Sequence, residues 1–498
     1  MSLISVSNVT FAHEGNYINL FEDMSFKIDT SWKLGFVGRN GKGKTTFLKL
    51  LLGEHEYKGS ISSTEEFLYF PLEVENEENM VLYIMEEFAP SRMQWEIEKE
   101  LSLLQVNAEV LYRPFKTLSN GERTKVLLAS LFLKEHVFLL IDEPTNHLDI
   151  QARKVVGEYL NKKQGFILVS HDRQLLNACT DHTLSLNRNS MDIQKGNYVS
   201  WYENKQRQNQ FEATENEKLR KDIKRLEAAA KQTAEWAGKV EKTKKVQQNA
   251  DGKPDRGYVG HQAARMMKRS KATEGRRQKA ADEKSGLLKD IEEVDELFLP
   301  GIAYPKETLA VLKDVQVQYD KAVPQVPLNL TVQRGDKIAL RGINGSGKSS
   351  ILKLFTTEST PYTGNLVMGS GLAVSYVPQD TAFLKGPLAG FIDENKLDEP
   401  LYKAILRKLG FEREQFEKSM EQYSAGQKKK VLVAKSFCEK VHLYVWDEPL
   451  NFIDVLSREQ IEQALMESGA TVIFVEHDAV FQNRVATKIV DLDAVKAK

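Results

Sequence analysis

One glycine-rich loop pattern occurs twice in this 498-residue chain, and each copy is followed by the same series of motifs. The two loops are Gly38-Arg39-Asn40-Gly41-Lys42-Gly43-Lys44-Thr45 and Gly342-Ile343-Asn344-Gly345-Ser346-Gly347-Lys348-Ser349. The motifs that recur with them, at a spacing of 304 to 306 positions, are Ser119-Asn120-Gly121 and Ser424-Ala425-Gly426, Asp142-Glu143 and Asp447-Glu448, and His171 and His477. Chance matches would not keep this register, so the sequence predicts a duplicated domain.

Each loop lies between an apolar run typical of a strand and a stretch typical of a helix, as a phosphate-binding loop requires. Glycines expose backbone N–H groups to phosphate oxygens, and the start of a helix adds its positive end. The lysine of each loop, Lys44 or Lys348, is expected to reach the β- and γ-phosphates. The residues expected to bind ATP are Gly38, Asn40, Gly41, Gly43, Lys44, Thr45 and Thr46 in the first copy, and Gly342, Asn344, Gly345, Gly347, Lys348, Ser349 and Ser350 in the second.

The acidic pairs follow the apolar runs 137–141 and 443–446, which read as buried parallel strands. After a strand, such a pair could simply cap a helix, and a lone histidine at a strand end is usually structural. Their order behind a phosphate-binding loop instead indicates metal binding and activation of water. The expected Mg²⁺ ligands are Thr45, Asp142, Ser349 and Asp447. The expected catalytic residues are Glu143 and Glu448, which polarise the attacking water, and His171 and His477, which contact the γ-phosphate.

Composition restricts the setting of these two domains. No run of about 18 apolar residues is present, so the sequence predicts no membrane span, and the first residues do not resemble a signal peptide. The two cysteines, Cys179 and Cys438, are expected to be small buried residues in a reducing compartment rather than a disulfide. We therefore predict a cytoplasmic α/β protein with domains at 1–201 and 300–498 and a linker at 202–299.

The linker has the pattern of a helical hairpin. Apolar or small residues at alternating spacings of four and three, a thin coiled-coil seam, are Leu219, Ile223, Leu226, Ala230, Thr233, Ala237 and Val240. Glycine and proline between 252 and 260 interrupt this pattern, and a second helical stretch is expected at about 262–297. Arms of about 35–40 residues would extend roughly 50–60 Å at the rise of an α-helix.

The far end of this hairpin, near 242–261, is predicted to be basic. Positions 242–279 hold twelve Lys or Arg against three acidic residues, a net charge of +9, whereas the whole chain carries −1. A solvated coiled coil would explain an ordinary charged helix, but this excess beside possible stacking residues favours contact with RNA. The residues expected to make it are Lys242, Lys244, Lys245, Arg256, Tyr258 and His261.

The two Ser-x-Gly motifs resemble the signature of ATP-binding cassette (ABC) proteins, and the residues at 146–149 and 451–454 resemble the D-loop of that family. The resemblance implies a head-to-tail arrangement of the two cassettes, closing within one monomer around two ATP molecules. In it, Ser424 and Gly426 would complete the site of Lys44, while Ser119 and Gly121 would complete the site of Lys348. By position, His13 and Tyr319 would stack on the adenine rings.

The repeats differ at one expected Mg²⁺ ligand. The second contains Tyr376-Val377-Pro378-Gln379, whose glutamine is similar to that of the family's Q-loop, whereas the first contains Tyr69-Phe70-Pro71-Leu72. Leucine cannot coordinate a metal ion or a water molecule. The sequence therefore predicts unequal sites, the first of which binds ATP but hydrolyses it slowly.

A cassette pair with a long basic hairpin resembles the translation-linked ABC-F class. The paired ATPase of a membrane importer has no use for such a hairpin, and a DNA-repair ATPase would carry a longer coiled coil or zinc-binding cysteines. The short interval from Leu72 to Ser119 and the short segment after His477 favour the antibiotic-resistance branch over the housekeeping translation factors. The resemblance implies binding at the exit site of the ribosome's 50S subunit, contact with rRNA and P-site tRNA, and release of lincosamides, streptogramin A and pleuromutilins. DNA and membranes are not expected partners.

Overall fold

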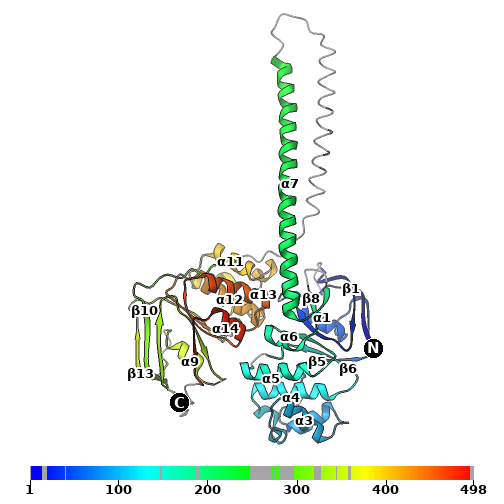
Figure 1. Cartoon of the computed structure of the whole chain (residues 1–498), viewed down its shortest axis with the longest axis vertical. Coiled ribbons are helices and arrows are strands. Elements are labelled where there is room, and N and C mark those ends of the chain that lie inside the picture. The colour runs from blue at the N-terminus through cyan, green and yellow to red at the C-terminus, as the bar shows by residue number, and fades with distance from the viewer. Residues whose placement is uncertain are drawn as a thin grey trace, which may run out of the picture. The chain divides into compact units, whose positions relative to one another are not determined.

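Each repeat folds as a separate α/β cassette, which confirms the predicted fold class. The structure, a computed structural model, describes residues 2–13, 19–39, 41–145, 148–186, 191–246, 268, 272, 276, 279, 296–318, 327–343, 345–356 and 360–493. The chain divides into two compact units, one formed by residues 1–201 and 294–498 and the other by residues 202–293. The first unit contains both cassettes, and Figure 1 shows their elements.

The first cassette contains two sheets. The larger has the order β5-β6-β7-β3-β8-β9 and is parallel except for β9. Its strands are β3 (Lys33–Val37), β5 (Glu66–Phe70), β6 (Val137–Asp142), β7 (Phe166–Val169), β8 (His182–Leu186) and β9 (Met191–Lys195). The smaller sheet is antiparallel, in the order β2-β1-β4, with β1 (Leu3–Phe11), β2 (Phe21–Asp29) and β4 (Lys58–Ser62). The helices are α1 (Lys44–Leu51), α2 (Val81–Phe88), α3 (Gln94–Leu103), α4 (Asn120–Leu133), α5 (Ile150–Asn161) and α6 (Arg173–Cys179), with short 3-10 helices at Ala108–Tyr112 and Phe115–Thr117.

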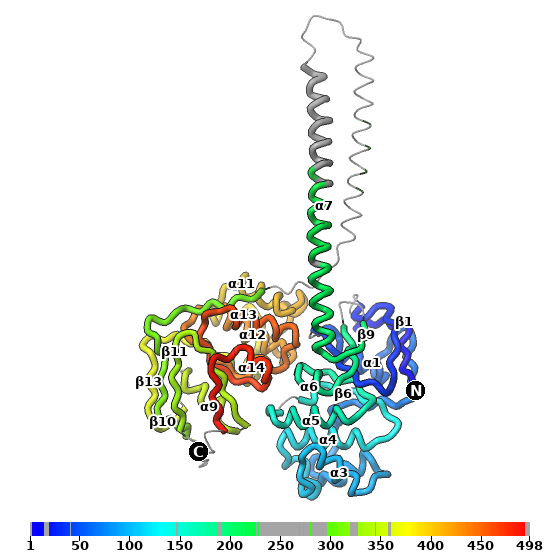
Figure 2. Tube along the Cα trace, viewed as in Figure 1, coloured from blue at the N-terminus to red at the C-terminus, as the bar shows by residue number. Residues whose placement is uncertain are grey.

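The second cassette repeats this plan. Its parallel sheet has the order β14-β15-β16-β12-β17, with β12 (Lys337–Arg341), β14 (Val374–Val377), β15 (Leu443–Asp447), β16 (Thr471–Val475) and β17 (Lys488–Asp491). Its antiparallel sheet, which Figure 2 shows as adjacent traces, consists of β10 (Thr308–Val317), β11 (Leu328–Gln333) and β13 (Tyr362–Met368). The helices are α9 (Lys348–Lys353), α10 (Leu388–Glu394), α11 (Glu399–Lys408), α12 (Ala425–Cys438), α13 (Val455–Glu467) and α14 (Ala479–Val485), with 3-10 helices at Arg413–Glu417 and Met420–Gln422.

The central strands are apolar apart from charged residues at some of their ends, because both faces of each parallel sheet are covered. In β16 every residue is buried, and in β6 the run from Phe138 to Ile141 is buried. Strands β3, β6 and β7, like their counterparts β12, β15 and β16, end side by side. The loops that leave their carboxyl ends carry the glycine-rich motif, the acidic pair and the histidine, so the topology brings these motifs together.

The linker begins with a longer helix than the sequence suggests. Helix α7 runs from Tyr198 to Val246, 49 residues, or roughly 70 Å at 1.5 Å per residue. Its first residues precede the expected start of the linker at 202, and of these Tyr198 and Trp201 are buried in the first unit. The second unit ends at residue 293 rather than at the expected 299, since Leu297 and Leu299 pack in the core of the second cassette.

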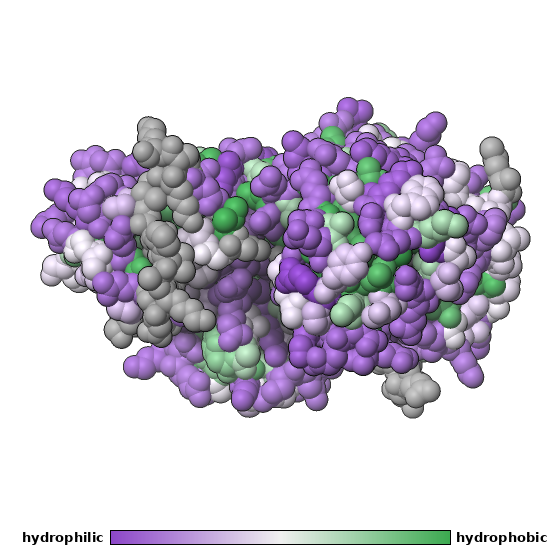
Figure 3. Space-filling model, turned by 90° about the horizontal axis from the view of Figure 1, so that it is seen from below, coloured by the Kyte–Doolittle hydropathy of each residue, from purple (hydrophilic) through white to green (hydrophobic). Residues whose placement is uncertain are grey.

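Most of the expected second arm, and Arg256, Tyr258 and His261 of the expected tip, lie outside the described residues. Of that arm the structure describes Lys268, Ala272, Arg276 and Lys279, which are helical and exposed. Within the described part of the chain, no helix combines the length and apolarity needed to cross a bilayer. Hydrophilic residues also predominate on the face shown in Figure 3.

Candidate active sites

Both glycine-rich loops have the geometry of a phosphate cradle. Each connects a central strand, β3 or β12, to the first turn of a helix, and the residue before that helix is a glycine in the left-handed region, Gly43 or Gly347. At Gly43, with φ of 99°, an added Cβ would lie 2.8 Å from Leu20 Cδ2 and 2.9 Å from Phe21 Cζ. The positive φ angle and the lack of room for a Cβ atom therefore both require glycine at position 43. Asn40 and Asn344 lie outside the described residues.

The loop lysines are buried and point back along their own loops. Lys44 Nζ donates hydrogen bonds to the carbonyl oxygens of Gly38, at 2.7 Å, and Arg39, at 3.2 Å. Lys348 Nζ likewise donates to Gly342 O at 2.8 Å and Ile343 O at 2.9 Å. Burial lowers the pKa of both amines, while nearby carboxylates oppose that shift. An amine held by carbonyl groups at the base of a cradle of N–H groups is suited to a polyphosphate.

A hydroxyl group and a carboxylate meet at the end of each cradle. Thr45 Oγ1 donates a 2.8 Å hydrogen bond to Asp142 Oδ2 in the first cassette, and the side chain of Ser349 bonds Asp447 in the second. Burial raises the pKa of both aspartates. Asp447 Oδ1 is buried and has no hydrogen-bond partner among the described residues. Such hard oxygen donors fit Mg²⁺, which usually takes one or two protein ligands and completes its shell with water and phosphate.

The glutamates that follow these aspartates contact the histidines. Glu143 and Glu448 both have positive φ angles, 50° and 48°, which are uncommon for a residue with a side chain. His171 Nε2 lies 3.3 Å from Glu143 Oε1, and His477 Nε2 lies 3.2 Å from Glu448 Oε1. Strain of this kind is concentrated at functional sites. The unusual backbone aims each carboxylate toward the histidine and the phosphate loop.

The environments of the two glutamates differ. Burial, and then the charge of Asp142, raise the pKa of Glu143 to about 8. Burial would also raise the pKa of Glu448, but hydrogen bonds from His477 and Gln379 and the charge of Lys429 outweigh it and leave that pKa below its ordinary value. The predicted inequality of the sites thus has a structural counterpart. Leu72 gives Glu143 no hydrogen bond equivalent to that of Gln379.

Several residues at the sites were missed by the sequence reasoning. Tyr69 donates a 3.0 Å hydrogen bond to Asp142 Oδ2, in the first cassette's counterpart of the Gln379 segment. Lys429 is buried in α12 and donates to Pro378 O at 2.8 Å and Asp447 O at 3.2 Å, whereas the equivalent residue in α4 is Thr124. Asn451 donates to Glu448 Oε2. The matching Tyr-x-Pro spacing in both repeats could have revealed Tyr69. Nothing in the run of lysines at 428–430 shows that Lys429 and Lys430 are buried, or that Lys429 is the one that reaches Asp447.

A cavity of about 430 Å³ surrounds the first cradle and is lined by both cassettes. Its lining from the first cassette is His13, Leu20, Gly41, Gly43, Lys44, Thr45, Thr46, Asp142, Glu143, Val169 and His171, and from the second Glu412, Glu414, Gln415, Lys418 and Gln427. An ion pair of 2.6 Å joins Lys42 of the first cassette to Glu412, one of the lining residues from the second. Ser424 and Gly426 begin α12 next to Gln427 but do not themselves line this cavity.

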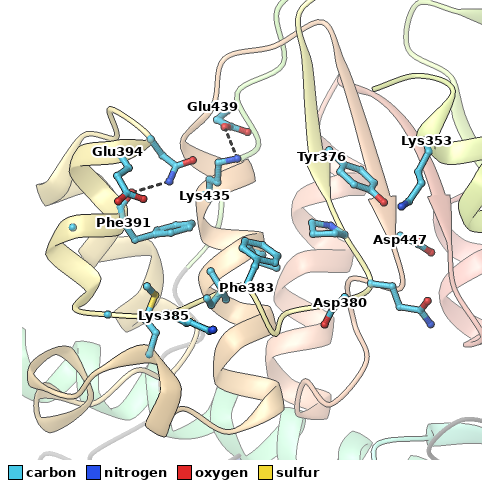
Figure 4. A pocket seen from close by; sticks show the side chains of 18 of the residues that line it. Lys353, Tyr376, Asp380, Phe383, Lys385, Phe391, Glu394, Lys435, Glu439 and Asp447 are labelled. Carbon is cyan, nitrogen blue, oxygen red and sulfur yellow. Dashed lines mark hydrogen bonds and ion pairs between the residues drawn. The ribbon is translucent and has the colours of Figure 1, made fainter. Parts of the chain in front are cut away.

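A second cavity, of about 1050 Å³, adjoins the other cradle and is lined by residues 349–447 of the second cassette. Figure 4 shows Tyr376, Asp447 and Lys353 together on one side of it and Phe383, Phe391 and Lys385 on the other. Ser349, Ser350 and Gln379 also line it. Ser119 and Gly121, expected to complete this site, do not. Tyr319 lies outside the described residues, whereas His13 lines the first cavity with its ring 5.1 Å from that of Phe11.

The two signature serines begin helices. Ser119 Oγ accepts a hydrogen bond from Glu122 N and Ser424 Oγ one from Gln427 N, and in each case the side chain of the later residue accepts from the serine N–H. This reciprocal capping box fixes the first turn of α4 and of α12. Each motif therefore presents the start of a helix, which is the end that attracts anions.

Comparison with known proteins agrees with this geometry. The sequence model of the ABC transporter family matches residues 21–146 and 326–451, which include both cradles and both acidic pairs. The chain belongs to the ABC transporter family. It is a tandem ABC ATPase of the ABC-F type, which binds ATP at its cassettes and hydrolyses it, as the sequence predicted.

Curated relatives match almost the whole chain. The uncharacterized ABC transporter ATP-binding protein YfmM of Bacillus subtilis is 28% identical, with 98% of each chain covered. The ribosome protection protein VmlR of the same organism is 26% identical over 96% of this chain and 84% of its own length. The ATP-binding protein Uup of Buchnera aphidicola is 25% identical over 98% of this chain and 80% of its own.

Solved structures share the fold at lower identity. The archaeal ribosome recycling factor aABCE1, in its complex with the ribosomal stalk protein aP1, has a TM-score of 0.60 and 19% identity, covering 97% of this chain and 87% of its own. The protein described as RNase-L Inhibitor matches with the same TM-score and identity. These likenesses concern the fold alone.

Proposed function

We propose that this protein is an ATP-dependent ribosome-binding factor that dislodges antibiotics by inserting its interdomain hairpin toward the peptidyl-transferase centre. The observation that carries the proposal is the match of nearly the whole chain to a ribosome protection protein. A 49-residue helix leading to a basic segment is the feature that suits such a role. The finer assignment follows the sequence's resemblance to Lsa(A), and with it the expected action against lincosamides, streptogramin A and pleuromutilins.

The cassettes would supply the switch. ATP bound between them favours closure because each phosphate chain is held by one cradle and by the signature helix of the other cassette. Thr45 with Asp142, and Ser349 with Asp447, would hold Mg²⁺, which neutralises phosphate charge when bound. At the second site, Glu448 is ionised at neutral pH and takes a proton from the attacking water, while His477 keeps its carboxylate in place. Hydrolysis then allows the cassettes to part and the protein to leave the ribosome.

The hairpin would be the effector. Lys242, Lys244 and Lys245 lie near the end of α7, and Lys268, Arg276 and Lys279 are exposed helical positions on the returning chain. Cationic side chains of this kind neutralise phosphates, and contacts with rRNA and P-site tRNA are therefore the proposed role of this region. Arg256, Tyr258 and His261 are proposed to lie at the contact itself, where an aromatic ring can stack on an unpaired base.

Deletion of residues 246–260, closed with a short glycine turn, tests the proposal. Drug susceptibility is measured in cells that express each variant at matched protein level, and ribosome binding is measured with ATP. The deleted protein should keep its ATPase activity, because the ATP sites belong to the other compact unit, but it should lose resistance. Tyr258→Ala should reduce protection with little loss of affinity. Substituting Lys154, an exposed lysine of α5, by alanine is the matched control.

Two outcomes would contradict this function. Full resistance from the shortened protein would exclude the hairpin as the effector. A protein that binds ribosomes and alters translation of particular messages, yet protects against none of the three drug classes, would instead fit the alternative of a housekeeping ABC-F factor acting on peptidyl-tRNA. Binding to a membrane transporter subunit in place of the ribosome would favour the remaining alternative, that the protein is the paired ATPase of a membrane transporter.

A further inference from the structure

A cluster of buried ion pairs joins the two cassettes beside the first ATP site. Arg173 begins α6 two residues after His171 and is 7% exposed. Its Nη2 lies 2.8 Å from Glu462 Oε2 and 3.4 Å from Asp478 Oδ2 of the second cassette. Arg484 Nη1 lies 2.6 Å from the other oxygen of Glu462. The acidic partners are almost completely buried, at 2% and 3% side-chain exposure.

A second arginine ties the same cluster to the first histidine loop. Arg458, in α13 of the second cassette, donates a 2.9 Å hydrogen bond from Nη1 to the backbone oxygen of His171. The same nitrogen lies 3.8 Å from Asp478 Oδ2, and Asp478 directly follows His477. The loops carrying the two histidines are thus connected through two arginines and one aspartate. Movement of either loop has to disturb this connection.

The duplication did not reproduce the cluster on the other side. The positions equivalent to Arg173 and Glu462 are Ala479 and Gly157. A Cβ at Gly157 would already lie 3.4 Å from Leu175 Cδ1, because α5 and α6 pack closely there. Arg153, the equivalent of Arg458, has Nε donating to Leu148 O at 2.9 Å and Nη1 3.3 Å from Asp172 Oδ2, contacts within its own cassette that Arg458 also makes in the second. The hydrogen bond of Arg458 to His171 O in the other cassette is what distinguishes it. The two cassettes therefore differ in the residues that they contribute to the contact between them.

We propose that Arg173, Glu462, Asp478 and Arg458 form a one-sided clamp that keeps the first ATP site closed while the cassettes open at the second. Separation at the first site would remove Arg173 from Glu462 and Asp478 and would break the hydrogen bond from Arg458 to His171, while Arg484 and Arg458 would stay beside the two acids. Removing one partner from a buried ion-pair cluster is costly. The lining of the Lys44 cavity by both cassettes and the Lys42–Glu412 ion pair place further contacts on that side. Arg173 and Arg458 are positioning residues, since they act through the histidine loops.

The clamp is consistent with the predicted slow hydrolysis at the first site. Leu72 deprives that site of the glutamine that assists Glu448 at the second, so nucleotide would remain in it through several turnovers of its neighbour. A nucleotide retained at the first site keeps the two cassettes in contact there. The protein then needs to close only at the second site in each cycle. This inference depends on the ATPase activity alone and holds whether or not the ribosome is the partner.

The experiment measures opening at each site separately, in the full-length protein without ribosomes. Pairs of spin labels are placed at exposed positions in a background with Cys179 and Cys438 replaced by alanine. Lys58 and Glu417 report on the first site, and Thr363 and Tyr112 on the second. Distances are compared by pulsed electron resonance between ATP-trapped and ADP-bound protein. We expect the second distance to lengthen in ADP while the first is unchanged.

The variants decide whether the cluster is responsible. Arg173→Ala, and Glu462→Gln as a milder change that keeps the side-chain shape, should allow the first distance to lengthen as well. They should also speed release of the tightly held nucleotide by about tenfold or more, the factor that corresponds to 1.4 kcal/mol. Lys154→Ala removes an exposed charge from α5 and should change neither readout.

Three results would overturn the clamp. The first is equal opening of both sites in the unmodified protein. The second is a first-site distance that stays fixed in a correctly folded Arg173→Ala or Glu462→Gln variant. The third is the absence of any nucleotide that survives gel filtration. Loss of antibiotic protection with normal one-sided opening would instead contradict the proposed function and leave the clamp intact.

Discussion

Glu143 and Glu448 stand at the same place in the two repeats, yet their surroundings shift their pKa values in opposite directions. The difference comes from neighbours rather than from the glutamates. Gln379 and Lys429 stabilise the ionised form at the second site, and their counterparts in the first repeat are Leu72 and Thr124. At neutral pH the second glutamate is therefore ready to accept a proton, while the first is largely protonated.

This difference predicts unequal effects of the single Glu→Gln variants. Glu448→Gln should reduce steady-state ATPase activity by on the order of a hundredfold, the scale of a lost general base, and Glu143→Gln should reduce it much less. The residual activity of Glu448→Gln should rise between pH 7 and pH 9, because Glu143, with a pKa of about 8, ionises over that range. Activity assays across pH check both expectations. Equal losses from the two variants would refute the asymmetry.

Adding the missing glutamine tests the cause. Leu72→Gln in the Glu448→Gln background should raise first-site hydrolysis at pH 7, since a hydrogen bond to the carboxylate lowers its pKa. Leu72→Met is the matched control, because it changes the side chain without adding a donor. If both substitutions had the same effect, packing rather than hydrogen bonding would explain the difference between the sites.

Helices α4 and α12 each begin with a serine that caps the helix and is also expected to contact phosphate. Ser424 caps α12 and is also expected to contact the γ-phosphate of the ATP held by Lys44. The cap depends on a local side-chain oxygen, whereas phosphate contact depends on closure of the two cassettes. Substitutions of Ser424 can therefore distinguish its role as a helix cap from its role in contacting phosphate.

Ser424→Ala should lower the stability of the protein without ATP by about 0.5–2 kcal/mol, the usual cost of losing such a cap. Ser424→Asp keeps a capping oxygen, so it should retain most of this stability but weaken ATP-dependent closure through charge repulsion. Thermal unfolding with and without ATP measures both effects. An aspartate variant that closes with ATP as well as the native protein would show that Ser424 does not face phosphate.

At the scale of the whole molecule, a chain of nearly balanced charge keeps its positive residues concentrated in one segment. That distribution matters for binding to RNA, because released counterions make such binding sensitive to salt. The net charge of −1 by itself would have given no reason to expect an RNA partner.

Replacing Lys268, Arg276 and Lys279 together by glutamine should weaken ribosome binding and make it less dependent on salt. Each lost phosphate contact should reduce the slope of log K against log salt by about 0.7–0.9. The check is ribosome co-sedimentation in ATP over a range of salt concentrations. The control replaces two exposed lysines of the cassettes, Lys58 and Lys154, and the half-buried Lys403 by glutamine. An unchanged slope for the hairpin variant would exclude these residues from contact with RNA.

The amino-acid sequence alone was enough to predict the two cassettes and the order of their motifs, and it shows that Leu72 stands where the second repeat has Gln379. These properties are local, since a phosphate loop needs its glycines in a fixed order and a covered strand needs a continuous apolar run. It also indicated the hairpin, but not that its first helix, α7, begins at Tyr198, inside the range assigned to the first cassette.

Tertiary structure decided which distant side chains meet. Tyr69 with Asp142, Lys429 with Asp447, and Arg173 with Glu462 and Asp478 are separated by up to 305 positions, and no spacing rule relates them. Their interactions arise because burial removes water, after which a charge is stable only beside a partner that the fold has brought within a few ångströms. Sequence repetition indicates where the two cassettes are alike, and the contacts between them show where they differ.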